Sequence, residues 1–248
     1  MEKFIDTHAH LNLHSFKKDR FPIIESCLLN NISLINIGTN FLDSKLAVEI
    51  AEKYSDKVYA TVGIHPSEIE EGFDFEKLKE LAKNKKVVAI GEIGLDYFYP
   101  SSDIDFIKKQ KQAFLKQLEI AEELNLPIVI HSRDAFDDLY EILKTKNLRG
   151  VIHCFSGDVK ELERFLKLGY YIGFNGIIFK ADLDEVIKKT PNDKILLETD
   201  CPFLTPPDFY EKRNNPLSLK IIKEKICKIK GEDITDQIYN NSLKLFNI

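Results

Sequence analysis

The sequence lacks several features that would place the protein in a membrane or an oxidising compartment. It contains no apolar run near the roughly 18 residues that a membrane-spanning helix needs. Its start shows no positively charged segment followed by a long apolar stretch, so we expect no signal peptide. The four cysteines are not spaced as C-x-x-C, which argues against a zinc ribbon or a redox pair. We therefore expect a cytoplasmic protein with no membrane partner.

An excess of positive charge is also missing. Lysine and arginine together number 35 and aspartate and glutamate 40, which gives a net charge of −5 at pH 7. A general binder of polyanions would carry a positive balance, so this class is disfavoured. If the protein meets nucleic acid, the contact must come from a local basic patch or from bound metal ions. Nothing in the sequence indicates an obligate protein partner.

Eight short apolar segments alternate with longer helical patterns along the chain of 248 residues. Nearly continuous apolar character is typical of parallel strands that are covered on both faces. Eight strand–helix units in about 250 residues predict an α/β protein with a (β/α)8 TIM barrel, a single domain over residues 1–248. The expected strands begin at Phe4, Ile32, Val58, Val87, Pro127, Gly150, Tyr170 and Lys194.

Helical patterns are expected at residues 43–54, 106–125, 134–146 and 158–169, and again from about Leu217 and Ile234. In segment 158–169, Asp158 suits the first cap and Gly169 suits the stop. After the last strand, residues 201–216 hold four prolines and show no helical period. This composition predicts a long, stiff loop, which inside a compact domain is more often functional than accidental.

The first expected strand carries three polar residues among apolar ones. Because successive strand side chains point to opposite faces, Asp6, His8 and His10 are expected to share one face. Asp6 and Glu198 are interpreted as acceptors for the second ring N–H of metal-binding histidines. The alternative is a structural salt bridge deep in the barrel.

Histidines and carboxylates recur at the ends of the expected strands. The active sites of α/β barrels form at that face, so these side chains are expected to converge. Four imidazoles and two carboxylates suit one or two divalent ions such as Zn²⁺, Mn²⁺ or Mg²⁺, and a two-metal site indicates hydrolysis. Each residue taken singly also fits a structural role. The expected ligands are His8, His10, Glu92, His131, His153 and Asp200.

These residues lie within motifs that resemble the TatD family of metal-dependent deoxyribonucleases, among the amidohydrolase-like barrels. The motifs run in family order over nearly the whole chain. They are "DTHAHL" (6–11), "GIHP" (63–66), "GEIGLDY" (91–97), "LNLPIVIHSRDA" (124–135), "HCFSG" (153–157), "YIGFNG" (171–176), "LLETDCPFL" (196–204) and "RNNP" (213–216).

The resemblance implies two ion sites that share one carboxylate. Two histidines would hold each ion: His8 and His10, with Asp200 nearby, for one, and His131 and His153 for the other. Glu92 would bridge the two ions, where relatives with a phosphotriesterase-like site carry a carbamylated lysine. The implied cofactors are two divalent ions, Mg²⁺ or Mn²⁺ in function, with Zn²⁺ also possible.

The resemblance also implies a reaction. A metal-activated water would hydrolyse phosphodiester bonds at a single-stranded DNA end, in the 3′ to 5′ direction, with RNA as a possible substrate. Asp200 or Glu92 would accept the proton of the water. His65 would lie close to the substrate phosphate, and a plain hydrogen bond at the strand end is its alternative. These three are the expected catalytic residues.

Two other functions remain open for the same site. One is hydrolysis of an amide, ester or lactone, such as deacylation of D-aminoacyl-tRNA, because fold and metals support many reactions. The other is a metal-binding scaffold with vestigial activity, which the intact ligand set disfavours.

Candidate substrate contacts follow from residue type. Arg133 and Arg213 suit phosphate, because the guanidinium fork matches its geometry, and surface ion pairs are the alternative. Four aromatic residues after strand ends could stack on an unpaired base or simply pack a loop. They are Tyr97, Phe98, Tyr99 and Phe203.

The chain departs from the family pattern at two places. Asn12 stands where the family usually has aspartate, and "FYEKRNNP" replaces the usual "RGKRNEP". Neither change touches an expected ligand. We therefore expect them to affect substrate preference rather than the chemistry.

Overall fold

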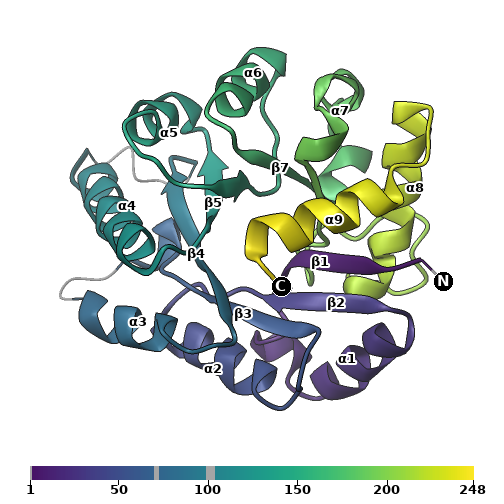
Figure 1. Cartoon of the computed structure of the whole chain (residues 1–248), viewed down its shortest axis with the longest axis horizontal. Helices are drawn as coiled ribbons and strands as arrows, with labels where there is room; N and C mark the ends of the chain where they lie inside the picture. The colour runs from purple at the N-terminus through teal and green to yellow at the C-terminus, as the bar shows by residue number, and fades with distance from the viewer. Residues whose placement is uncertain (1, 70–72, 99–103) are drawn as a thin grey trace.

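The computed structural model describes residues 2–69, 73–98 and 104–248, and its centre is a sheet of eight parallel strands (Figure 1). The strands follow one another around the sheet in chain order, so each pairs with its sequence neighbour. Every predicted strand is found, and the α/β barrel is confirmed. The strands are β1 (Phe4–Ala9), β2 (Ile32–Asn36), β3 (Val58–Val62), β4 (Val87–Asp96), β5 (Ile128–Arg133), β6 (Gly150–Ile152), β7 (Tyr171–Phe174) and β8 (Ile195–Leu197).

Helices surround the barrel, as the ring of coiled ribbons in Figure 1 shows. The six predicted helical patterns correspond to α2 (Phe41–Ala51), α4 (Ile104–Leu124), α5 (Phe136–Leu143), α6 (Val159–Lys167), α8 (Leu219–Lys230) and α9 (Thr235–Phe246). The structure adds three further α-helices, α1 (Arg20–Leu29), α3 (Phe75–Ala82) and α7 (Asp184–Lys189). Among the described residues, none of the helices is long and apolar enough to cross a membrane.

The helix α6 begins where the sequence places its cap. The Asp158 side chain accepts from Glu161 N, and the Glu161 side chain accepts from Asp158 N, which completes a capping box. The helix stops before Gly169, whose φ of +88° is a left-handed conformation that glycine adopts without strain.

One end of the barrel is closed by the C-terminal helix. Apolar side chains from the first halves of the strands, such as Ile5, Val129 and Leu196, form a buried cluster with Leu245 and Phe246 of α9. Figure 1 shows α9 crossing the barrel beside β1. The strands therefore begin at a filled, apolar end, and polar chemistry is confined to the end where they finish.

The barrel closes between its first and last strands through a few backbone contacts. Ala9 and Cys201 form an isolated parallel bridge. His10 N donates to Cys201 O at 3.0 Å, and Asp200 N donates to His8 O at 2.8 Å. The seam of the barrel thus lies beside three of the expected ligands.

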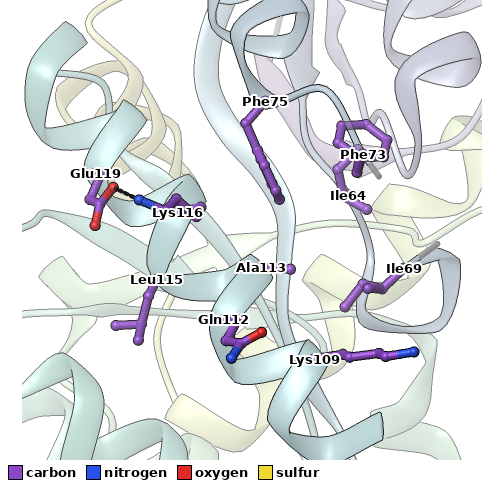
Figure 2. A pocket seen from close by; sticks show the side chains of 10 residues that line it. All are labelled: Ile64, Ile69, Phe73, Phe75, Lys109, Gln112, Ala113, Leu115, Lys116 and Glu119. Carbon is purple, nitrogen blue, oxygen red and sulfur yellow. Dashed lines mark hydrogen bonds and ion pairs between the residues drawn. The ribbon is translucent and has the colours of Figure 1, made fainter. Parts of the chain in front are cut away.

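A pocket of about 580 Å³ lies outside the barrel wall, between α4 and the segment around α3 (Figure 2). Apolar side chains, including Ile69, Phe73 and Phe75, form one side. The carboxylate in its lining, Glu119, accepts from Lys116 at 2.9 Å. Among the described residues of this lining, no group of three metal-binding side chains comes together. The candidate groups of metal ligands lie instead at the ends of the strands.

Candidate metal centre

The ends of the strands bring together all six expected metal ligands and His65. His8 comes from β1, Glu92 from β4 and His131 from β5, and the others lie just beyond β1, β3, β6 and β8. They line or underlie a pocket of about 390 Å³ at the mouth of the barrel. The members that line it are His10, His65, Glu92, His131, His153 and Asp200.

Four ligand atoms form a first cluster. The Nε2 atoms of His8 and His10 are 3.1 Å apart. Glu92 Oε2 lies 3.3 and 3.7 Å from them, and Asp200 Oδ1 lies 3.8 and 3.4 Å from them. Ligands about 2.0–2.1 Å from a tetrahedral ion are about 3.3 Å from one another, so this spacing fits one divalent ion.

A second cluster gathers around the other oxygen of Glu92. His131 Nδ1 lies 3.0 Å and His153 Nε2 lies 2.9 Å from Glu92 Oε1. One buried carboxylate therefore faces two histidine clusters with its two oxygens. This is the geometry expected of a ligand that bridges two ions.

The hydrogen bonding of the site also fits metal binding. The Nε2 of His153 is buried and has no partner of suitable hydrogen-bond geometry in the described part of the chain, although Glu92 Oε1 is near. A buried nitrogen without a partner is costly, and an ion between these two atoms would remove that cost. The donor set of imidazoles and carboxylates therefore fits divalent ions.

Charges in the site are strongly coupled. Burial alone would raise the pKa of Glu92, but His153 and other histidines around it hold that pKa well below its usual value. Burial and the nearby His153 lower the pKa of His8, which keeps it neutral, the form that binds metal. Burial works against protonation of His153, yet Glu92 and Glu198 raise its pKa well above the usual value. Without an ion, the positive charge of a protonated histidine therefore balances the negative charge of the carboxylates, and bound metal ions would take over that role.

The structure reveals one acidic residue that the sequence analysis missed. Asp96 Oδ2 lies 3.1 Å from His131 Nε2, so it can orient the ring whose other nitrogen faces Glu92. Asp96 is itself held, because its backbone N donates to Gln110 Oε1 and its O accepts from Gln110 Nε2. The signal was the two-residue alternation of strand β4, which continues from Glu92 to Asp96.

Glu198 lies where the sequence analysis expected an acceptor. Its Oε1 is 3.4 Å from His153 Nδ1 and accepts from Cys154 N at 2.7 Å and Asn175 Nδ2 at 2.8 Å. Glu198 is buried, and these donors hold it in place beneath the His153 ring. His153 Nδ1 makes no hydrogen bond of suitable geometry in the described part of the chain, so the role of Glu198 as an acceptor for that ring stays a prediction.

The expected arrangement of Asp6 is not found. Its carboxylate accepts from Thr199 N at 3.0 Å, from Thr199 Oγ1 at 2.6 Å and from His8 N at 3.2 Å, so its hydrogen bonds go to two backbone N–H groups and a hydroxyl rather than to a histidine ring. The pairing of β1 with β2 changes register between Asp6 and Ala9, which breaks the regular alternation assumed for this strand. Burial raises the pKa of Asp6 to about 7. Asp6 thus links β1 to the segment after β8.

His65 is held as a hydrogen-bond donor to the site. The backbone N–H of Ser67 donates to its Nδ1 at 3.1 Å. We infer from this contact that the proton of the neutral ring sits on Nε2, which lies 3.5 Å from Glu92 Oε1. Burial lowers the pKa of His65 to about 4, so the ring is neutral at pH 7. A protonated Nε2 does not bind metal, which agrees with a place beside the ions.

The two candidate arginines occupy different surroundings. Arg133 lines the pocket of the metal centre, and its guanidinium lies 3.4 Å from the centre of the Phe98 ring. Arg213 instead forms an ion pair with Asp19 and donates to Ser15 O. Its guanidinium therefore joins loop 201–216 to the segment after β1, as the ion-pair alternative expects, while Arg133 keeps its candidacy for phosphate.

Asn12 has a structural role beside the site. Its Nδ2 donates to Ile37 O at 3.0 Å and to Asp43 O at 3.3 Å, and the residue is buried. An ionised aspartate has no hydrogen to donate to these carbonyl oxygens. The amide at this position therefore ties the segment after β1 to β2 and α2.

The candidate aromatic residues also differ in their surroundings. Tyr97 Oη donates to Asp138 at 2.8 Å, and the Phe98 ring lies against Arg133. Phe203 lines the pocket of the metal centre and is 55 % exposed. Tyr99 lies outside the described residues.

Comparison with protein families gives one match over nearly the whole chain. The sequence model of the family described as "TatD related DNase" matches residues 5–247. The "Uncharacterized metal-dependent hydrolase YabD" of Bacillus subtilis is 39 % identical, and the match covers 98 % of each chain. The "3'-5' ssDNA/RNA exonuclease TatD" of Erwinia tasmaniensis is 35 % identical, with 98 % of this chain and 99 % of the relative covered.

Solved structures share the same architecture. The crystal structure of YjjV, a TatD homologue from Escherichia coli, superposes with a TM-score of 0.90 at 32 % identity, covering 99 % of this chain and 98 % of the other. A hydrolase of the TatD family from Entamoeba histolytica gives a TM-score of 0.87 at 25 % identity, with the same coverage of both chains.

Proposed function

Because the chain belongs to the family of TatD-related DNases and is a metal-dependent hydrolase of that type, we propose that it hydrolyses phosphodiester bonds at single-stranded DNA ends. The supporting observation is Glu92, whose two oxygens face two separate histidine clusters at the barrel mouth. The printed name of the Erwinia relative adds 3′ to 5′ polarity and RNA as a further substrate to this proposal. Two divalent ions, Mg²⁺ or Mn²⁺ with Zn²⁺ as an alternative, would supply an activated water and stabilise the charge on phosphate.

Asp200 is the better of the two candidate proton acceptors. Glu92 directs one oxygen to each histidine cluster and its side chain is 5 % exposed. Asp200 contacts His8 and His10 through Oδ1, and its side chain is 14 % exposed toward the pocket. Burial would raise the pKa of Asp200, but His10, His8 and His153 outweigh it and lower that pKa. The side chain therefore stays an ionised carboxylate. Asp200 therefore combines ionisation with access to water.

His65 and Arg133 are suited to hold the phosphate. The Nε2–H of His65 points toward the bridging carboxylate, where a phosphate oxygen would lie next to the ions. Arg133 lines the same pocket and offers a planar, positively charged fork.

The proposal is tested with a 5′-labelled single-stranded oligonucleotide and protein loaded with Mg²⁺ or Mn²⁺. We expect a ladder of labelled products that shorten from the 3′ end. Asp200→Asn should slow cleavage by about 10²- to 10⁴-fold, the usual contribution of a general base. Asp208→Asn, which changes an exposed carboxylate of the same loop, should cleave at the wild-type rate.

Two results would count against the proposal. Immediate release of the labelled mononucleotide would show that degradation starts at the 5′ end, opposite to the proposed direction. If wild-type protein and Asp200→Asn cleaved DNA at equal rates, and RNA likewise, this site would not be the one that catalyses nucleic-acid cleavage. The same preparations incubated with D-aminoacyl-tRNA would then test carboxyl-ester hydrolysis by the same donors.

A further inference from the structure

Phe203 combines exposure with a place beside the reactive groups. It lines the same pocket as the metal-binding side chains and is 55 % exposed. Its ring is 6.3 Å from the ring of His10, centre to centre, with an angle of 71° between the planes. A single exposed aromatic residue is ordinary on a protein surface, so exposure alone carries no function.

The backbone of Phe203 is fixed on both sides, although its ring is open to solvent. Phe203 N donates to Asp200 O at 3.0 Å. Phe203 O accepts from Asn214 Nδ2 at 2.6 Å, and the same nitrogen donates to Thr199 O at 3.0 Å. Asn214 is fully buried, and its Oδ1 accepts from Ser218 Oγ at 2.6 Å. Because the backbone is fixed, only the side-chain torsions of Phe203 lose freedom when something packs on the ring.

The backbone after β7 packs against the turn that holds Phe203. A Cβ built on Gly176 would lie 1.7 Å from Leu204 O, so the backbone after β7 touches the backbone that follows Phe203. Any side chain at position 176 would push the turn away. The fold therefore sets the position of the Phe203 backbone relative to Asp200.

The surroundings define what would cover this ring. A ligand must place a phosphate at the metal centre and a flat apolar surface against Phe203, and a nucleotide has both. Bases stack on aromatic side chains of proteins that bind single strands, and they do so regardless of sequence. Tyr97 and Phe98 are less suited, because the first is hydrogen-bonded to Asp138 and the second lies against Arg133.

We propose that Phe203 is the stacking platform for the unpaired base of the nucleotide at the strand end, and that it thereby determines the preference for single-stranded ends. This inference rests on the proposed nuclease function. A base inside a duplex is stacked on its neighbours and paired, and it would have to leave both to reach the ring. An unpaired terminal base makes the contact without that cost.

The test compares two oligonucleotides that differ at the 3′-terminal nucleotide, one with its base and one with an abasic tetrahydrofuran residue. Phe203→Ala should raise KM for the normal end by about tenfold, within the range found for loss of one base–aromatic stack. It should leave KM for the abasic end unchanged. Phe203→Tyr, which keeps an aromatic ring, should behave as wild type on both.

Tyr210→Ala is the matched control, because Tyr210 is 75 % exposed in the same loop. It should alter neither KM. Equal losses for Phe203→Ala on normal and abasic ends, or no loss on either, would overturn the stacking proposal. An unchanged Tm of Phe203→Ala would show that the fold is retained.

A binding measurement separates this inference from the nuclease proposal. A trinucleotide with 2-aminopurine at its 3′ end loses fluorescence when that base stacks. Addition of metal-loaded wild-type protein should quench it, and Phe203→Ala should not. Quenching without cleavage would reject the nuclease function and keep the stacking site, whereas no quenching by the wild type would reject the stacking site itself.

Discussion

Asp96 acts on the metal centre through another residue. It contacts His131 on the side away from Glu92, and Gln110 fixes its backbone through two hydrogen bonds. A carboxylate in this position selects the ring tautomer and aims the other nitrogen. The precision of the second cluster therefore depends on a residue that need not touch an ion.

We expect Asp96→Asn to weaken metal binding. An amide is a poorer partner for the His131 ring than a carboxylate, and loss of such a contact lowers metal affinity or activity by about 10- to 100-fold. Titration with Mn²⁺ followed by calorimetry measures the change.

Asp138→Asn serves as the control, because Asp138 contacts Tyr97 and Lys111 rather than a metal-binding residue. Metal affinity that is equal in Asp96→Asn and in the wild type would show that Asp96 has no such role.

Single residues were predictable from sequence where a strand end fixed their position. The six candidate ligands meet because parallel strands finish at one face of a barrel. Asp6 accepts hydrogen bonds from Thr199, and a pattern of two-residue alternation in β1 does not indicate this contact. Arg213 could not be resolved, because its partner Asp19 lies 194 residues earlier in the sequence.

Some helices begin at a residue whose side chain caps them, and others begin where tertiary packing dictates. The capping box of α6 is readable in the sequence, since Asp158 and Glu161 are three residues apart. The same holds for α2, where Asn40 accepts from Asp43 N at 2.9 Å. Such signals do not suffice alone, since α3 has a cap of the same kind at Asp74 and was not predicted.

Removal of the α6 cap should destabilise the protein modestly. Asp158→Ala leaves the N–H of Glu161 without its acceptor and is expected to cost about 1 kcal/mol of unfolding free energy. Urea unfolding measures this change, and cleavage per folded molecule should stay constant.

The control for this variant is Asp182→Ala, an exposed residue shortly before α7, which should unfold as the wild type does. An equal loss of stability in both variants would assign the effect to surface charge rather than to the cap.

Three α-helices of the described residues were not predicted. α3 and α7 have eight and six residues, which leaves few turns for an apolar period to show, and tertiary packing decides the existence of such helices. α1 has ten residues, more than the predicted α5 and α6, and carries Pro22 in its first turn, where proline is tolerated. Their buried residues, such as Ile24 and Leu78, join the core between helices and barrel.

At the scale of the whole molecule, folding brings together ionisable side chains that are costly to bury without partners. Glu92, Asp200 and several histidines are buried together. Ions that bind the folded chain and not the unfolded one add to its stability by mass action. The fold and the metal centre therefore depend on each other.

We expect metal removal to lower the Tm of the protein. Free ion at 100 times its Kd adds about 2.7 kcal/mol of stability, which chelation should abolish. Scanning calorimetry with Mn²⁺ and with excess chelator measures the difference.

Glu92→Gln should lose most of the metal-dependent shift, because the bridging charge is gone. Glu119→Gln, in the pocket outside the barrel, should retain it in full. The same Tm with and without saturating Mn²⁺ would contradict coupling between ions and fold.

The seam between β1 and β8 joins segments that are synthesised far apart in time. The ribosome makes His8 and His10 long before it makes Asp200 and the backbone that pairs with them. A nascent chain that stops before β8 therefore holds the histidines of the first cluster but lacks Asp200, the residue proposed to accept the proton of the water. We expect such a chain to stay inactive until the segment after β8 has joined β1.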